Sequence, residues 1–124
     1  MKKILILLFL LTPLFVGAQS WFTADAVSVG SGNSDGEWYE CHVRVFSDKD
    51  GNVKIYAPDN TLVYRRIGDN YTKDEDSEGM SIAWKCVDEE GQRCSLSFNS
   101  YEGMLWLMIE YNNYTVLYHI IPDN

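Results

Sequence analysis

MSIAWKCVDEEGQRCSLSFNS, residues 80–100, is the stretch of sequence that decides the fold. Apolar and polar side chains alternate on both sides of its acidic turn, which is typical of two β-strands that are each buried on one face. A three-residue loop ending in Gly91 would place every large side chain of the stretch on the same face. On this register the facing pairs are Met80 with Ser100, Ile82 with Phe98, Trp84 with Leu96 and Cys86 with Cys94.

Two further turns extend this pattern along the chain. Asp48–Asn52 has the same acidic start and the same glycine, so the same loop length pairs Val45 with Ile55. Asn112-Asn113 suits a two-residue type I′ turn, because asparagine tolerates positive φ. Together the turns and alternating runs predict eight strands, at residues 22–29, 38–47, 53–57, 61–67, 80–87, 94–100, 104–111 and 114–121.

The fold class that follows is all-β: a single small domain, residues 19–124, of about eight short antiparallel strands. The connections are short enough for hairpins, so the strands are expected to follow one another in a meander. Such a meander forms either a closed barrel or a two-sheet sandwich, and alternation alone does not decide between them. Residues 68–79 are rich in acidic side chains and contain no large aliphatic one, which predicts a mobile, solvated loop.

The domain follows an N-terminal signal peptide, which we place at residues 1–18. Two lysines precede an apolar run from Ile4 to Val16, and the small residues Gly17 and Ala18 come next. A membrane-spanning helix needs about 20 apolar residues, and this run is shorter. We therefore expect cleavage after Ala18, a secreted or periplasmic domain, and no membrane span after cleavage.

The charge of the chain argues against nucleic acid as a partner. The formal net charge is −8, and loss of the two signal lysines would make it −10. Such a surface repels phosphate backbones, while it keeps an exported protein soluble.

The three cysteines predict one disulfide and one leftover thiol. An exported domain of this size commonly gains stability from a cross-link. The hairpin register places Cys86 opposite Cys94, so the predicted disulfide joins these two and leaves Cys41 reduced. The pair would occupy a hydrogen-bonded site of the ladder, where bridging is more strained, so Cys41 remains an alternative partner.

Evidence for catalysis is thin, and we expect a non-catalytic protein with no cofactor and no metal site. His42 and His119 are the only histidines, and no nucleophile motif accompanies them. A hydrolase using His42 or a carboxylate pair is kept as a second alternative. The run from Asp74 to Gly79 imitates the first half of a calcium loop, but Lys85 stands where the closing glutamate is needed.

A binding function is the main prediction, with a protein or a carbohydrate as the suspected partner. Strands two to four are expected to gather aromatic and cationic side chains on one face. Such a face can stack on sugar rings or hold an acidic partner. The proposed ligand-binding residues are Arg44, Tyr56, Tyr64 and Arg66.

The last hairpin predicts the alternative function, a structural or assembly subunit. It is apolar on both faces, so one face is either exposed or covered. The proposed interface residues are Trp106, Met108, Leu117 and Ile121. The N-terminal segment, with Trp21 and Phe22, could instead lie across this face.

Overall fold

A computed structural model describes residues 19–31 and 36–123 as an all-β fold without helix. The predicted signal peptide, residues 1–18, lies outside the described residues. No helix in the described part of the chain is long and apolar enough to cross a membrane. The nine strands found there are β1 (Ser20–Gly30), β2 (Trp38–Ser47), β3 (Val53–Tyr56), β4 (Thr61–Arg66), β5 (Thr72–Glu75), β6 (Gly79–Val87), β7 (Arg93–Tyr101), β8 (Met104–Glu110) and β9 (Thr115–Pro122).

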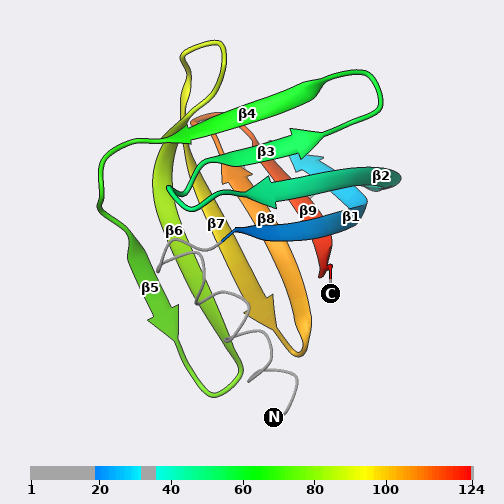
Figure 1. The fold of residues 1–124 in the computed structure, drawn as a ribbon. Coiled ribbons are helices and arrows are strands. Elements are labelled where there is room, and N and C mark those ends of the chain that lie inside the picture. Colours follow the sequence, from blue (N-terminus) through cyan, green and yellow to red (C-terminus); the bar gives the residue numbers. More distant parts are fainter. Residues whose placement is uncertain (1–18, 32–35, 124) are drawn as a thin grey trace.

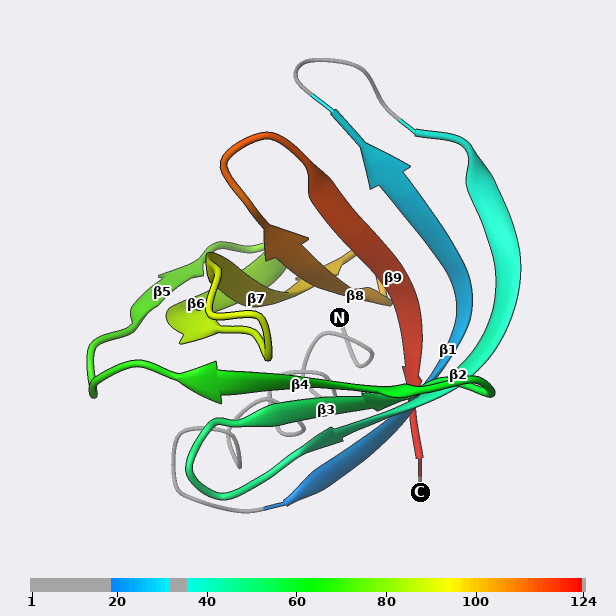
Figure 2. The same cartoon turned by 90° about the horizontal axis from the view of Figure 1, so that it is seen from above.

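All nine strands belong to one antiparallel sheet whose hydrogen bonding closes into a ring. The order is β4-β3-β2-β1-β9-β8-β7-β6-β5, and β4 also pairs with β6. Strands β1–β4 run across one side of the molecule, and β6–β9 run across the other at a steep angle (Figure 1). Seen from above, β1, β2 and β9 curve around one flank and join the two layers (Figure 2). The predicted meander of antiparallel strands is therefore confirmed.

The hairpin of residues 80–100 has the predicted register. Trp84 pairs with Leu96 and Ile82 with Phe98. Gly91 has a φ of 82°, a conformation that glycine adopts without steric cost. The side chain of Asp88 stabilises the turn, because its Oδ1 accepts hydrogen bonds from the backbone amides of Glu90 and Gln92 at 3.0 and 2.9 Å.

The turn at Asp48 repeats this arrangement, as the sequence predicts. Asp48 Oδ1 accepts from the amides of Asp50 and Asn52 at 2.9 and 3.0 Å, and Gly51 has a φ of 89°. Val45 lies opposite Ile55 across this hairpin. The same local chemistry therefore builds two turns in different parts of the ring.

The prediction of a loop from Gly68 to Gly79 is wrong for its middle, residues 72–75, although these residues are exposed as expected. Residues 72–75 form β5, which pairs with β6 along the edge that β4 leaves free. All four β5 side chains are exposed, so this strand adds backbone hydrogen bonds but nothing to the core. Alternation of apolar and polar residues predicts only strands that have a buried face, and β5 has none. Its charged residues are typical of an edge strand.

The prediction of a type I′ turn at Asn112-Asn113 is also wrong. The connection has two residues, and Leu107 lies opposite Tyr118 as expected. Positive φ angles occur instead at Glu102 and Gly103, in the turn between β7 and β8. Glycine adopts a positive φ without steric cost, so left-handed residues are easier to accommodate in the turn with Gly103 than at Asn112-Asn113.

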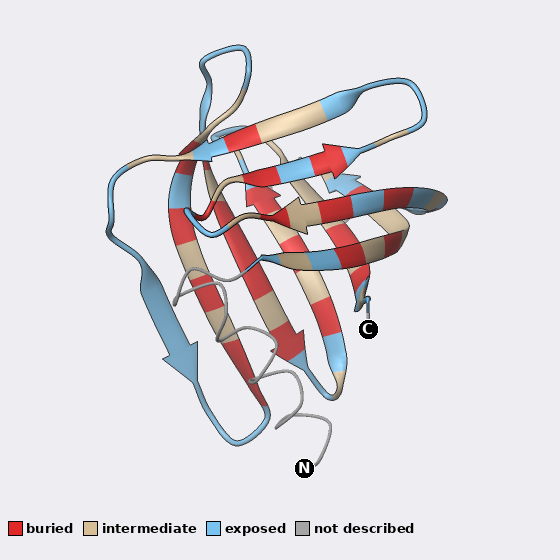
Figure 3. Cartoon of the chain, in the orientation of Figure 1, coloured by how far each residue is buried: buried red, intermediate tan, exposed pale blue. Residues whose placement is uncertain are grey.

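The core lies between the two layers of the ring. Buried and less buried residues alternate along the central strands (Figure 3), as expected for strands with one face inward. Phe98 is fully buried at the centre, with its ring centroid 5.5 Å from that of Phe22 and 5.9 Å from that of Trp84. These aromatic contacts tie β1, β6 and β7 together.

Candidate binding site

The predicted ligand-binding residues do not share one face. Arg44 and Tyr56 are opposite each other on the outer face of β2 and β3. Tyr64 is buried on the inner face, opposite the core residue Val53. The reason is the β3–β4 connection, where the amide of Ala57 donates to the Asn60 carbonyl and fixes a register that turns Tyr64 inward.

Arg66, the fourth predicted residue, holds a turn in place. Its guanidinium lies 5.4 Å from the centre of the Trp84 ring and donates to the Asp69 carbonyl at 3.0 Å. Its backbone amide donates to Asn52 Oδ1 at 2.9 Å. These contacts fasten the β2–β3 turn to β4 and β6, which is a structural role.

The outer face around Arg44 is a cluster of side chains that cover one another. The Trp21 ring lies 4.5 Å from Phe46 and 5.8 Å from Tyr56. The Arg44 guanidinium lies 4.5 Å from the centre of the Trp21 ring and forms an ion pair with Asp123. Trp21 and Tyr56 remain 39% and 38% exposed, so more than half of each side chain is covered by its neighbours.

The predicted interface residues do lie together on the outer face of β8 and β9. Met108 pairs with Leu117, and Trp106 pairs with His119. Ile121 is 47% exposed near the end of β9. The N-terminal segment does not cover this face, because Phe22 is in the core and Trp21 packs against Phe46.

Trp38 of β2 extends this surface across β1. Its ring lies 5.6 Å from Trp106, which in turn lies 4.9 Å from His119. A bulge at Asp25 in β1 brings that carboxylate to 2.7 Å from His119 Nδ1. His42, the other histidine, is exposed beside Glu40 at 3.7 Å.

The predicted disulfide is not formed, although the predicted pairing is. Cys86 and Cys94 lie opposite each other, yet all three cysteines of the described chain are free. The hydrogen bond from the Asp88 amide to the Gln92 carbonyl makes Cys86 and Cys94 a hydrogen-bonded pair, whose side chains are farther apart than those of the alternate pairs. The Cys94 thiol instead points to the Cys86 carbonyl at 3.8 Å.

Thiol reactivity is the direct check on this arrangement. Burial and the neighbouring Cys94 raise the pKa of Cys86 to about 12, and burial and Asp88 raise that of Cys94 to about 11. Because the thiolate is the reactive form, alkylation at pH 8 should modify half-buried Cys41 first and the other two only after unfolding. Mass spectrometry of the alkylated peptides measures this order. A peptide pair linked through Cys86 and Cys94 would contradict it.

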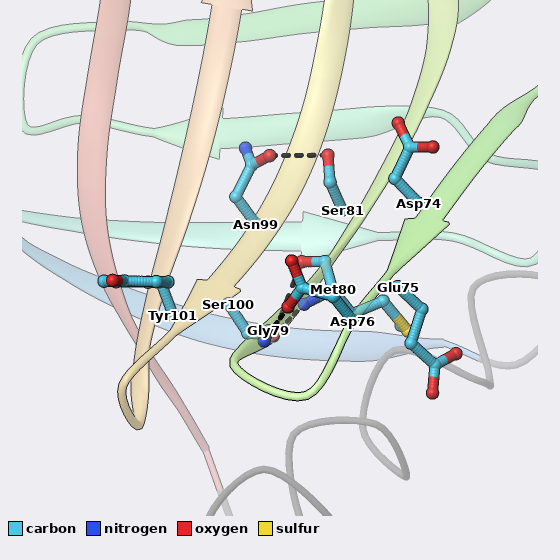
Figure 4. A pocket seen from close by; sticks show the side chains of 9 residues that line it. All are labelled: Asp74, Glu75, Asp76, Gly79, Met80, Ser81, Asn99, Ser100 and Tyr101. Carbon is cyan, nitrogen blue, oxygen red and sulfur yellow. Dashed lines mark hydrogen bonds between the residues drawn. The ribbon is translucent and has the colours of Figure 1, made fainter.

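The acidic segment around β5 lines an open hollow of about 500 Å³ (Figure 4). The carboxylates of Asp74, Glu75 and Asp76 point in different directions. Asp76 accepts hydrogen bonds from the amides of Glu78 and Gly79 at 2.8 and 2.9 Å, so it is engaged in its own turn. Within the described chain, no three His, Cys, Asp or Glu residues are placed to hold a metal ion.

A second hollow, of about 460 Å³, is the better candidate site and was not predicted from the sequence. It lies at one end of the ring, where β4 separates from β6 beyond their two paired residues, Arg65 and Arg66. We call it the tyrosine pocket. It is lined by Tyr64, Tyr111, Tyr114 and Tyr118, by Leu62 and Val116, and by the acidic turn Asp88–Gln92.

A hydrogen-bond network fixes the walls of the tyrosine pocket. The Tyr111 hydroxyl donates to Asp88 Oδ2 at 2.8 Å, and it is also hydrogen-bonded to the hydroxyl of Tyr64. The Tyr111 and Tyr114 rings stack 4.7 Å apart at 17°. Glu89 accepts from the Val63 amide at 3.2 Å and so bridges the gap between the turn and β4. The pocket is therefore already formed without a ligand.

These contacts shift the titration of the groups involved. Burial, followed by the hydrogen bond to Asp88, raises the pKa of Tyr111 above its ordinary value. Burial alone would raise the pKa of Asp88, but the hydrogen bonds from Tyr111, Gln92 and Glu90 outweigh it and lower the pKa. Asp88 is therefore ionised and Tyr111 is neutral near pH 7.

A pH dependence of stability follows from Asp88. A carboxyl with a depressed pKa in the folded state stabilises the fold above its unfolded value, near 3.8, and loses this contribution as the pH falls through the folded value. Asp88→Asn should therefore be less stable than wild type at neutral pH, and the gap should narrow below about pH 4. Chemical denaturation across the acid range measures it, and a gap that stays constant would contradict the prediction.

The sequence carried only partial signals for this site. The acidic turn and the two tyrosines beside Asn112-Asn113 are visible in it, but nothing local shows that they meet Tyr64. That contact depends on where β4 leaves β6, which is a property of the closed ring.

Comparison with protein-family models, with curated proteins and with solved structures finds no match to this chain.

Proposed function

We propose that the chain is an exported, non-catalytic binding module that recognises a protein at the cell envelope or outside the cell. The observation that carries the proposal is the tyrosine pocket. Its volume of about 460 Å³ lies within the range of about 300–1,000 Å³ that is usual for ligand sites. It also combines aromatic and aliphatic side chains with polar groups that hydrogen bonds hold in place.

The position of the pocket favours a macromolecular partner. Its rim is made by three connections, which join β3 to β4, β6 to β7 and β8 to β9. Loops carried on a rigid sheet are a common place for binding residues. Tyrosine is also enriched where protein interfaces concentrate their binding energy, because its ring buries a large area and its hydroxyl still finds a partner.

The experiment uses a photo-crosslinking amino acid in place of Gln92, an exposed residue of the pocket lining, to capture the partner from the envelope and the medium. The captured protein is then purified, and its affinity for unlabelled wild type and variants is measured by calorimetry. Tyr114→Ala should weaken binding about tenfold, which corresponds to about 1.4 kcal/mol.

Tyr101→Ala is the matched control. It removes a tyrosine that is half exposed at the far end of β7, and affinity should change less than about twofold. Equal losses in both variants, an unaffected Tyr114→Ala, or capture of glycan alone would overturn the proposal.

The surface around Trp38 and Trp106 supports a second candidate function, assembly. Trp38 is 48% exposed and contacts Trp106, which lies with Met108 and Leu117 on the outer face, while Ile121 lies beyond His119 on β9. Sedimentation over a range of concentrations tests this: an assembly subunit self-associates or requires a partner here, and Trp38→Ser should reduce that association. A monomer whose partners all survive Trp38→Ser rules it out.

A further inference from the structure

We propose, on the basis of the function above, that the tyrosine pocket takes up a cationic side chain, the guanidinium of arginine or the ammonium of lysine, from the partner protein. This inference names the chemical class of the group recognised. Three features of the pocket support it: the negative charge of the lining, the arrangement of the tyrosine rings, and the hydrogen bonds that Asp88 already makes.

The charge of the lining is negative. Asp88, Glu89 and Glu90 line the pocket, and no lysine, arginine or histidine is among the described residues that do so. None of the ion pairs in the described chain includes Glu89 or Glu90. Arg65 follows Tyr64 on β4, is exposed, and lines an adjoining hollow that it shares with Asp88 and Glu89, so Glu90 is the one carboxylate of the pocket that shares no hollow with this cation.

The three carboxylates differ in what they have left to offer. Both oxygens of Asp88 are already used, by two backbone amides and by Tyr111. Asp88 therefore organises the pocket. Glu89 already accepts from the Val63 amide with Oε1, so its other oxygen and the carboxylate of Glu90 remain as acceptors for a ligand. Hydrogen bonds between a cationic donor and a carboxylate are about twice as strong as neutral ones.

The aromatic walls suit the same kind of group. A guanidinium or ammonium within about 6 Å of a tyrosine ring is attracted to the face of the ring. Tyr111 and Tyr114 stack on each other and both line the pocket beside the acidic turn, so a cation would contact the outer side of this ring pair. The chain already uses this contact twice, with Arg44 over Trp21 and Arg66 over Trp84.

A neutral sugar would fit the rings but would leave two carboxylates without a charged partner. An anionic group would be repelled by all three. The net charge of −8 acts in the same direction at long range, since it attracts a basic partner toward the protein.

The test is an NMR titration of the purified protein with a hexa-arginine peptide and with the matched hexa-citrulline peptide, which is neutral and of similar shape. We expect saturable shifts at the ring signals of Tyr111 and Tyr114 with arginine, and binding of citrulline at least about fivefold weaker. Failure of the arginine peptide to shift these signals, or equal binding of both peptides, overturns the inference.

Paired variants separate a specific site from general attraction. Glu89→Gln with Glu90→Gln should weaken arginine binding about fivefold. Asp74→Asn with Glu75→Gln removes the same charge from the hollow of Figure 4, at the other end of the β6–β7 hairpin, and should have a much smaller effect. Equal losses in both pairs would show diffuse electrostatics and contradict a site.

The outcome also distinguishes this inference from the proposed function. If Tyr114→Ala still weakens the captured partner while both peptides bind equally, the pocket is a protein-binding site and the cationic group is wrong. If Tyr114→Ala has no effect on the partner but arginine still binds selectively, the pocket takes a cation and the proposed function is wrong.

Discussion

Phe98→Ala should destabilise the protein by about 3–5 kcal/mol, the largest effect of any single truncation we expect. Phe98 is fully buried and touches the rings of both Phe22 and Trp84, so its removal leaves a cavity where β1, β6 and β7 meet. A domain of this size commonly has only about 5–15 kcal/mol in total. Denaturant unfolding measures the change, and partial unfolding at 37 °C is expected.

Ser95→Ala is the matched control on the same strand. Ser95 lies on the outer face of β7, and its truncation should change the unfolding free energy by less than about 0.5 kcal/mol. A loss of less than about 1 kcal/mol for Phe98→Ala would mean that the ring does not pack around this residue.

Gly79→Ala should cost about 3 kcal/mol, although it adds a single methyl group. A Cβ at this position would lie 2.0 Å from the backbone carbonyl oxygen of Ser100, which cannot move unless the backbone of β7 moves with it. The start of β6 would have to separate from β7, which breaks the pairing of Gly79 with Tyr101. Thermal and denaturant unfolding both measure the loss.

Gly91→Ala separates this crowding from backbone strain. Gly91 has a positive φ, but a Cβ there would meet no atom within 4 Å. Its substitution should therefore cost only about 1–2 kcal/mol, the penalty of a left-handed residue. A Gly79→Ala variant that is as stable as Gly91→Ala would contradict the close approach.

Local patterns were enough to predict most of the fold. Residues 80–100 specify their own register, because a shift by one position would place Trp84 and Phe98 in solvent. The edge strand β5 could not be predicted in this way, since none of its side chains is buried. Its formation depends on the free edge of β6, which exists only once β4 has turned away.

The candidate site was less predictable for the same kind of reason. Arg44 and Tyr56 lie opposite each other, as the predicted pairing of Val45 with Ile55 implies. Tyr64 was assigned to their face but lies on the inner one, because the sequence does not fix the register of β4 on β3. The tyrosine pocket joins residues from β4 to β9 through contacts between distant parts of the chain. Alternation along a strand gives the direction of each side chain and not its neighbours across the ring.

The pairing of β1 with β9 also has a consequence for how the chain folds during synthesis. Phe22 lies opposite Pro122, and the Asp123 amide donates to the Trp21 carbonyl, so the first strand meets the last. The hairpins join neighbouring segments and can form as they emerge, whereas the pairing of β1 with β9 closes a loop that spans the described domain. Until β9 has been synthesised, β1 has a partner on one edge only, so this junction of the ring is among the last to form.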